Sequence, residues 1–197
     1  MSDTSGRSGL CQRETAETRI RVQIELDRSE PVRIHTGIPF FDHMLNQIAR
    51  HGRFGLVLEA DGDLEVDCHH TVEDCGLALG AALDQALGER RGIARYATAY
   101  VPMDEALARV VLDLSGRPYL HANLPLDVER IGSFETQTLV EFLRALTVTG
   151  RLTLHADFLH GVNAHHLVEA LFKALGRALR DAVRLEGDWL PSTKGVL

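Results

Sequence analysis

The sequence predicts an α+β fold in which two similar halves, one after the other along the chain, pack as layers about a pseudo-twofold axis. Three observations lead to this prediction. Short segments of alternating apolar and polar residues lie between longer segments with apolar residues at i, i+3, i+4 and i+7. A motif at residues 69–83 recurs at residues 165–179. The 197 residues, of which 45% are hydrophobic and 25% charged, are enough to bury one core.

The repeat is the strongest of these observations. HHTVEDCGLALGAAL and HHLVEALFKALGRAL lie 96 residues apart and are identical at nine of fifteen positions. The preceding helical segments align at an offset of 98, which sets His43 opposite Glu141. A repeated unit cannot bury its hydrophobic face alone, so the two copies are expected to share a core. We therefore expect a single domain over residues 1–197, with halves at about 17–100 and 101–190.

Each half is predicted to run strand, strand, helix, strand, helix. Residues 1–15 are rich in Ser, Gly, Thr and Arg, and we expect them to be disordered. The predicted strands are 18–26, 54–60, 62–67, 106–114, 117–126 and 151–159. The predicted helices are 37–52, 69–88, 135–148 and 164–187. Pro39 and Gly52 are the start and stop signals of the first helix, and Pro191 and Gly195 make the tail irregular.

The composition excludes several classes of protein. A net charge of −7 and a pI of about 5.8 give no basic surface for nucleic acid. No apolar run reaches the ~20 residues that cross a bilayer, and the N-terminus lacks the apolar stretch of a signal peptide. Three cysteines without CxxC spacing indicate reduced thiols. We expect a cytoplasmic protein with neither a nucleic-acid nor a membrane partner.

The motif His-His-x-x-Glu begins both repeated helices. Its members are His69, His70 and Glu73 in the first half and His165, His166 and Glu169 in the second. Adjacent helical residues project about 100° apart, so the two histidines of a pair would each hold a different ion. Four imidazoles and two carboxylates suit two ions of the Mn²⁺, Fe²⁺ or Zn²⁺ type. One such motif would more often be a helix cap, but packing gives no reason to repeat it in register.

Further polar residues extend this candidate site. His43 lies on the preceding helix and could complete one site, whereas His51 could instead interact with the negative end of that helix. Cations and hydroxyls close to a metal centre suit a phosphate ester. The candidates are Arg95, Arg117, Lys173, Ser192 and Lys194. The glycine spacing of a nucleotide P-loop is absent, which favours a small phosphorylated metabolite over ATP.

The segments GIPFFDHML, HHTVEDCGLALG, SGRPY, NAHHLVEALFKALGRAL and PSTKG together resemble the imidazoleglycerol-phosphate dehydratase family of histidine biosynthesis. The resemblance runs from about Glu17 to Lys194. It implies a lyase (EC 4.2.1.19) that converts a small phosphorylated imidazole, D-erythro-imidazoleglycerol 3-phosphate, to imidazole-acetol phosphate and water. It also implies two Mn²⁺ per active site, other divalent ions being alternatives, and a homo-oligomeric 24-mer shell with its sites at subunit interfaces.

The resemblance also assigns residues by position. One metal would take His69, Glu141, His165 and Glu169. The other would take His43, His70, Glu73 and His166. The substrate and its phosphate would be held by Glu17, Gln47, His51, Arg95, Arg117, Lys173, Ser192, Thr193 and Lys194. Position 141 holds a glutamate where other members have a histidine, and a carboxylate can also ligate a hard divalent ion.

The implied chemistry gives two metals a purpose. The proton to be removed is not next to a carbonyl, so no enolate can stabilise the charge. An imidazole between two cations can ionise to imidazolate, because the cations lower the pKa of its N–H, and the ring then expels the neighbouring hydroxide. A carboxylate acts as general base on the next carbon. Glu169 is the first candidate for this base and Glu17 the second, with Glu73 also among the catalytic candidates.

Two other classes of function remain open from the residues alone. A dinuclear metallohydrolase would use a bridging hydroxide and release inorganic phosphate, although such sites are usually richer in aspartate. A metal-storage or metal-stabilised shell protein would have no use for the basic residues. In that case Arg117→Ala would leave metal content and assembly unchanged.

Overall fold

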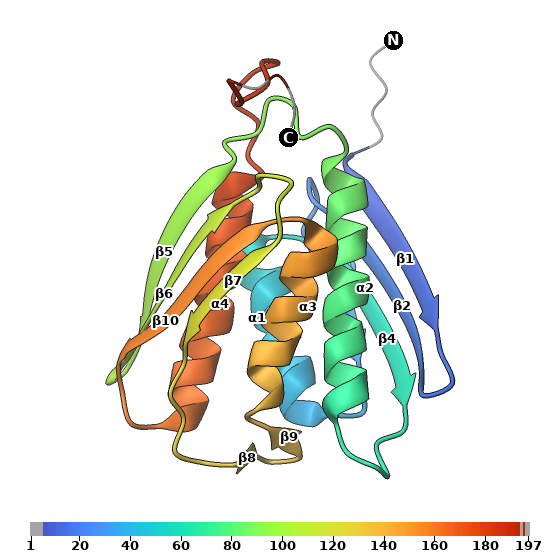
Figure 1. Cartoon of the computed structure of the whole chain (residues 1–197), viewed down its shortest axis with the longest axis vertical. Helices are drawn as coiled ribbons and strands as arrows, with labels where there is room; N and C mark the ends of the chain where they lie inside the picture. Colours follow the sequence, from blue (N-terminus) through green and yellow to red (C-terminus); the bar gives the residue numbers. More distant parts are fainter. Residues whose placement is uncertain (1–5, 194, 196–197) are drawn as a thin grey trace.

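Two four-stranded sheets enclose four helices (Figure 1). The computed structural model describes residues 6–193 and residue 195. The strand order is β1-β2-β4-β3 in one sheet and β5-β6-β10-β7 in the other. Figure 1 shows one sheet on each side of the molecule, with the helices between them. The predicted α+β class is confirmed.

The second half repeats the first. The first half consists of β1 (Ser8–Glu14), β2 (Thr18–Glu25), β3 (Val32–His35), α1 (Pro39–Gly52), β4 (Gly55–Gly62) and α2 (His69–Leu87). The second consists of β5 (Tyr96–Met103), β6 (Ala106–Asp113), β7 (Tyr119–Asn123), α3 (Thr138–Gly150), β10 (Thr153–His160) and α4 (Ala164–Ala182), with the short strands β8 (Arg130–Ile131) and β9 (Phe134–Glu135) inserted before α3. In each sheet two antiparallel pairs are followed by one parallel pair, β3 with β4 and β7 with β10. Apart from β8 and β9, each half therefore has three strands before its first helix, one more than expected.

Several segments differ from the sequence-based expectation. β3 and β5 lie where the sequence predicts no strand, and the helix predicted over 164–187 ends at Ala182. Residues 8–14, expected to be disordered, form β1 because they pair along their whole length with β2 and lie against α2. A Cβ at Gly9 would lie 1.9 Å from the carbonyl oxygen of Ala82, so the glycine allows β1 to lie this close to α2. Residues 1–5 lie outside the described residues. The strand expected at 62–67 is instead a turn, in which Val66 N–H donates to the carbonyl of Asp63.

The helices pack across the two halves, α1 against α4 and α2 against α3. A glycine lies at each crossing. A Cβ at Gly176 of α4 would be 2.7 Å from the carbonyl oxygen of Ile48 in α1, and one at Gly80 of α2 would be 2.7 Å from that of Leu146 in α3. Gly80 and Gly176 are 96 residues apart, as are the two histidine pairs. The same close crossing therefore occurs twice and sets the separation of side chains on neighbouring helices.

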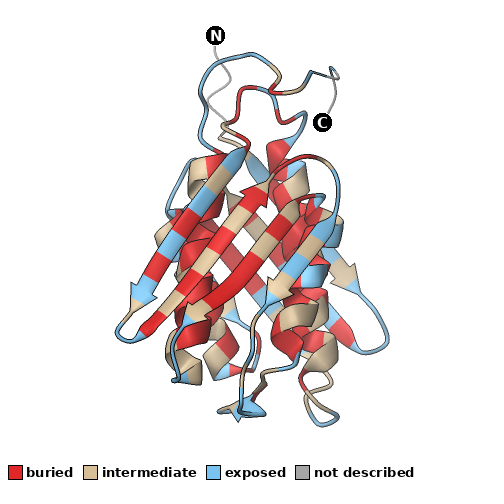
Figure 2. Cartoon of the chain, turned by 60° about the vertical axis from the view of Figure 1, so that its left-hand side comes forward, coloured by how far each residue is buried: buried red, intermediate tan, exposed pale blue. Residues whose placement is uncertain are grey.

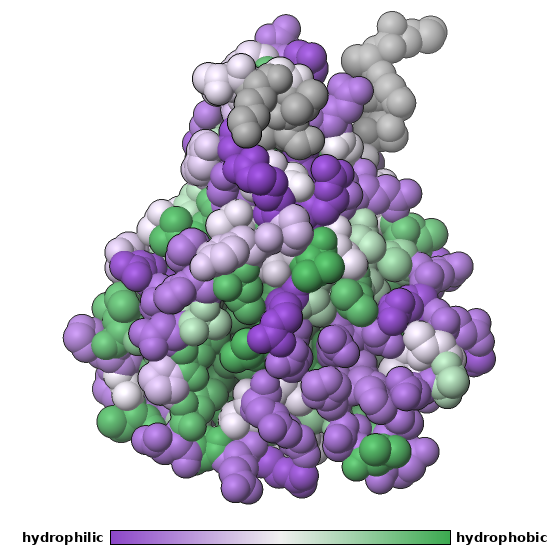
Figure 3. All heavy atoms as spheres, viewed as in Figure 1, coloured by the Kyte–Doolittle hydropathy of each residue, from purple (hydrophilic) through white to green (hydrophobic). Residues whose placement is uncertain are grey.

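The sheets are amphipathic. Along β6, Ala106, Ala108, Val110 and Leu112 are buried against the helices and alternate with more exposed residues, a pattern that Figure 2 shows across the second sheet. Hydrophilic residues cover most of the face seen in Figure 3, while apolar residues are visible between the two sheets. Among the described residues, every helix is too short or too polar to span a bilayer.

Candidate active site

At the start of each helix that carries a histidine pair, a side chain accepts a hydrogen bond from the backbone of that pair. The backbone N–H groups of His165 and His166 donate to Asn163 Oδ1, at 2.9 and 3.3 Å. In the first half the N–H of His69 donates to Asp67 Oδ1 at 2.7 Å. Such side chains satisfy N–H groups that a helix leaves unpaired in its first turn. Sequence reasoning missed Asp67 and Asn163, although extending the repeat by two residues at its offset of 96 would have found them.

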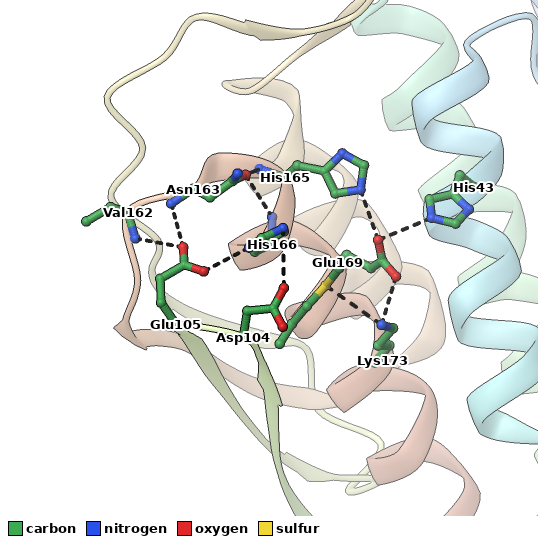
Figure 4. Close-up of polar contacts among 10 residues, drawn as sticks. His43, Asp104, Glu105, Val162, Asn163, His165, His166, Glu169 and Lys173 are labelled. Carbon is green, nitrogen blue, oxygen red and sulfur yellow. Dashed lines mark hydrogen bonds and ion pairs between the residues drawn. The ribbon is translucent and has the colours of Figure 1, made fainter.

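The best-defined cluster lies between α1 and α4 (Figure 4). His43 Nε2 is 3.2 Å and His165 Nε2 is 3.0 Å from Glu169 Oε2. The three ligand atoms all lie within 4.8 Å of one another. Glu169 is buried, whereas the two imidazoles are partly exposed. This is a donor set of two nitrogens and one oxygen with access from solvent.

A lysine holds the other oxygen of this carboxylate. Lys173 Nζ is 2.8 Å from Glu169 Oε1. Burial raises the pKa of Glu169, but hydrogen bonds from Lys173, His165 and His43 outweigh it and bring the pKa to about 2. Glu169 is therefore ionised at neutral pH, as a metal ligand must be.

Two further predicted residues lie along α1 beside this cluster. Gln47 Nε2 is 3.3 Å from His43 Nε2. Burial, together with the neighbouring cations Lys173 and Arg177, lowers the pKa of His51. Gln47, His51 and Lys173, to which the resemblance assigns substrate binding, thus lie beside this cluster.

The second histidine of this pair points the other way (Figure 4). His166 Nδ1 is 2.8 Å from Glu105 Oε2, in the turn between β5 and β6. Glu105 Oε1 accepts hydrogen bonds from the backbone N–H groups of Asn163 and Val162, at 2.9 and 3.3 Å. The hydrogen bond with His166 is the largest of the causes that lower the pKa of Glu105 to about 2, and it raises the pKa of His166.

The start of α2 is arranged similarly but more loosely. His69 Nε2 is 3.7 Å from Glu73 Oε2. His70 Nδ1 is 3.0 Å from Asp63 Oδ2, and Glu17 Oε2 lies 3.8 Å away. The hydrogen bond with Asp63 raises the pKa of His70.

Glu141, the repeat equivalent of His43, pairs with Arg144 on its own helix. Within the described residues, His43, His165 and Glu169 are the one group of three side chains close enough to hold an ion together. That group takes members from both ligand sets that the resemblance implies. Neither set is gathered whole by one chain.

The basic candidates are divided between two ends of the molecule. Arg95 Nε is 2.7 Å from Asp113 Oδ1, and Arg117 Nη2 is 3.9 Å from Asp113 Oδ2. Arg95 also lines a pocket with Ser192 and Thr193, while Lys194 lies outside the described residues.

The length of α4 separates these basic residues from the imidazoles. The backbone N–H of Arg95 donates to the carbonyl of Ala182, at the end of α4. Glu169 is 13 residues earlier on the same helix, so the two ends lie roughly 20 Å apart at 1.5 Å per residue. One chain therefore places its imidazoles and its Arg95–Arg117 pair at opposite ends.

Fold and site together define a class: a duplicated α+β protein whose helix starts offer imidazole and carboxylate ligands for divalent ions such as Mn²⁺, Fe²⁺ or Zn²⁺. The family model for imidazoleglycerol-phosphate dehydratase matches residues 36–179. The imidazoleglycerol-phosphate dehydratase of Moorella thermoacetica is 57% identical over 193 residues, covering 97% of this chain and 98% of that protein. The one from Caldanaerobacter subterraneus subsp. tengcongensis is 55% identical and covers 97% and 100%.

Solved structures agree with these relatives. Imidazoleglycerol-phosphate dehydratase from Staphylococcus aureus has a TM-score of 0.82 at 41% identity and covers 90% of this chain and 99% of its own. IGPD from Pyrococcus furiosus has a TM-score of 0.83 at 39% identity, with 94% and 99% covered. The chain belongs to the imidazoleglycerol-phosphate dehydratase family. The predicted lyase class, EC 4.2.1.19 in histidine biosynthesis, is confirmed, which sets aside the metallohydrolase and storage alternatives.

Proposed function

We propose that this chain dehydrates D-erythro-imidazoleglycerol 3-phosphate to imidazole-acetol phosphate, using two divalent ions per active site, with Mn²⁺ as the first candidate. The observation that carries the proposal is the convergence of His43 Nε2 and His165 Nε2 on Glu169 Oε2. Two imidazoles and an ionised carboxylate, partly open to solvent, fit a cation that must also accept a substrate atom. The other proposed ligands are His69, His70, Glu73, Glu141 and His166.

The residues of this chain supply binding, orientation and proton transfer. Bound ions would lower the pKa of the substrate's imidazole N–H and so help the ring to expel the neighbouring hydroxide. Glu169 is our first candidate for the general base, because its ionised carboxylate lies between His43 and His165 at the centre of the cluster. Glu17, 3.8 Å from His70 Nδ1, is the second, and Glu73, 3.7 Å from His69 Nε2, is the third.

We further propose that each active site combines two chains in a homo-oligomer, for which the 24-mer shell is the candidate assembly. A ring, three carbons and a phosphate cannot reach across the roughly 20 Å between the imidazoles and the Arg95–Arg117 pair of one chain. The imidazole end of one subunit would therefore meet the basic end of another. There Arg95, Arg117, Ser192, Thr193 and Lys194 would hold the phosphate, with Gln47, His51 and Lys173 nearer the ring.

Two smaller proposals accompany this one. We propose that the chain is one domain with halves of about 17–100 and 101–190, with the first half extended back to β1 and the boundary between them moved back to Tyr96, where β5 begins, because the helices pack across the halves. We also propose a cytoplasmic location, which is supported by Cys11, Cys68 and Cys75 all being free thiols.

The direct test is turnover. Protein reconstituted with Mn²⁺ should convert imidazoleglycerol phosphate to the ketone, and EDTA should abolish the reaction. Metal-replete protein that forms no ketone would refute the proposal, and release of inorganic phosphate would indicate a hydrolase instead.

A mixing experiment tests the shared site. At a substrate concentration below the wild-type KM, Arg117→Ala and His165→Ala should each have little activity alone, because each variant has one weakened or missing end in every site. Co-assembled in equal amounts, they should recover about a quarter of the wild-type activity, since one site in four combines both intact ends. No recovery from mixed oligomers would place both ends of the site in one chain.

A further inference from the structure

The second histidine of each pair is held by a carboxylate through Nδ1. His166 Nδ1 is 2.8 Å from Glu105 Oε2, and His70 Nδ1 is 3.0 Å from Asp63 Oδ2. The first histidine behaves differently, since His165 directs Nε2 at Glu169. In both halves the second imidazole therefore has its Nδ1 bonded and keeps Nε2 for another partner.

This contact does not follow from the duplication. Glu105 precedes β6, so its structural equivalent in the first half is Glu17, the residue that precedes β2. Asp63 follows β4 instead. Glu17 also faces His70 Nδ1, but at 3.8 Å it is too far away for a hydrogen bond, and Asp63 makes the bond instead. The same atom, Nδ1, is bonded in each half from a different element, which indicates a requirement of the imidazole itself.

We propose that Asp63 and Glu105 are positioning residues, which keep the imidazole proton of His70 and His166 on Nδ1 and so present Nε2 to a metal ion. This inference rests on the metal-dependent function proposed above. A neutral imidazole carries one N–H, and the hydrogen bond made by one ring nitrogen decides which nitrogen is free to ligate. A carboxylate on Nδ1 also fixes the plane of the ring.

The carboxylate of Glu105 is itself held in place. Its Oε1 accepts the backbone N–H groups of Val162 and Asn163, just ahead of α4, while Oε2 faces His166 (Figure 4). The neighbouring Asp104 does not compete for the ring. Its carboxylate is 3.8 Å from His166 Nε2, too far for a hydrogen bond, and its side chain is 79% exposed. Nε2 is thus left for a ligand.

Asp63 offers the cleaner test of the two. Among the described residues its side chain bonds only His70, so removing it changes no backbone contact. Asp63→Ala and Glu105→Ala should each weaken Mn²⁺ binding by about 10- to 100-fold, the usual cost of losing such a partner. Calorimetric titration of metal-free protein measures the dissociation constant, and metal analysis after dialysis measures the stoichiometry. The loss should concern one of the two ions of each site.

Conservative and control variants separate positioning from folding. Asp63→Asn and Glu105→Gln keep an oxygen that can accept the Nδ1 proton, so they should lose less affinity than the alanine variants. Glu65→Ala, exposed in the same turn as Asp63, and Asp104→Asn, next to Glu105, should bind Mn²⁺ within about twofold of wild type, as surface changes usually do. Metal-free Asp63→Ala should unfold at the wild-type temperature.

The outcomes distinguish this inference from the function on which it rests. If wild-type protein binds two Mn²⁺ per site and the alanine variants bind them equally well, the positioning role is wrong and the proposed function stands. An equal loss of affinity in the control variants would also overturn it. If wild-type protein binds no Mn²⁺, both proposals fail.

Discussion

The crossing of α1 and α4 at Gly176 allows a quantitative prediction for Gly176→Ala. The new Cβ would lie 2.7 Å from the carbonyl oxygen of Ile48 and 3.1 Å from the backbone nitrogen of Gly52. Both are backbone atoms of α1 and cannot rotate away, so the two helices must separate by several tenths of an ångström. Overpacking costs about 1–3 kcal/mol, and a clash with fixed backbone atoms belongs to the upper part of that range, about 2–3 kcal/mol. Replacing a helical glycine by alanine returns about 1 kcal/mol through helix propensity.

We therefore expect Gly176→Ala to lower the free energy of unfolding by about 1–2 kcal/mol, or the melting temperature by roughly 2–8 °C. The assay is thermal unfolding in EDTA at one protein concentration, so that metal binding and assembly contribute equally to all samples. Arg177→Ala, at the exposed neighbouring position, should stay within about 0.5 kcal/mol of wild type. A Gly176→Ala variant as stable as wild type, or more stable, would show that the crossing has room for a methyl group and refute the reasoning.

Three further predictions concern single side chains. Arg90 is fully buried, pairs with Asp84 and donates to the carbonyls of Gly150 and Arg151. Arg90→Ala should therefore lower the free energy of unfolding in denaturant by about 3 kcal/mol. If it lowers that free energy no more than the exposed control Arg91→Ala does, the prediction is wrong. The pKa of Glu169 falls from 4.5 to about 2 on folding, so its contribution to stability is complete above pH ~4.5 and is lost as the pH falls toward 2. In that range the stability of metal-free Glu169→Gln should fall less steeply with pH than that of the wild type. Equal slopes would argue against the pairing of Glu169 with Lys173, His165 and His43. Arg117→Ala should raise KM about 10- to 100-fold with unchanged Mn²⁺ content, which steady-state kinetics and metal analysis would check, and an unchanged KM would remove Arg117 from phosphate binding.

Three of the four helices could be predicted to within three residues at each end, because their apolar spacing is long, whereas the helix predicted over 164–187 ends at Ala182. Gly52 ends α1 as expected, and the repeated His-His pairs begin α2 and α4. β1 and β5 could not. Most side chains of β1 are polar or small, and the large side chains of Tyr96 and Tyr100 in β5 are exposed, so the alternation that identifies β2 and β6 is weak in both strands. Their pairing with β2 and β6 decides the outcome.

The candidate site shows the same division. His165 and Glu169 are four residues apart on one helix, so the sequence alone places them side by side, and the structure shows a hydrogen bond between them. That His43 joins them, rather than His70 and Glu73, depends on which helices cross, which spacing along the chain does not encode. The opposite placement of the Arg95–Arg117 pair likewise depends on the full length of α4 and could not be read from a set of motifs. Asp63 and Glu105 carry no signal in the sequence, because each reaches its imidazole from a loop of a different sheet.

The separation of the two ends along α4 has a consequence for enzyme behaviour on dilution. If sites are shared as proposed, a dissociated subunit carries the imidazole end of one active site and the basic end of another, and it has no complete active site of its own. Catalytic rate per milligram would then rise with protein concentration and level off once every subunit has neighbours, whereas an enzyme with a self-contained centre would give a constant value. Control over association would in that case be control over histidine supply.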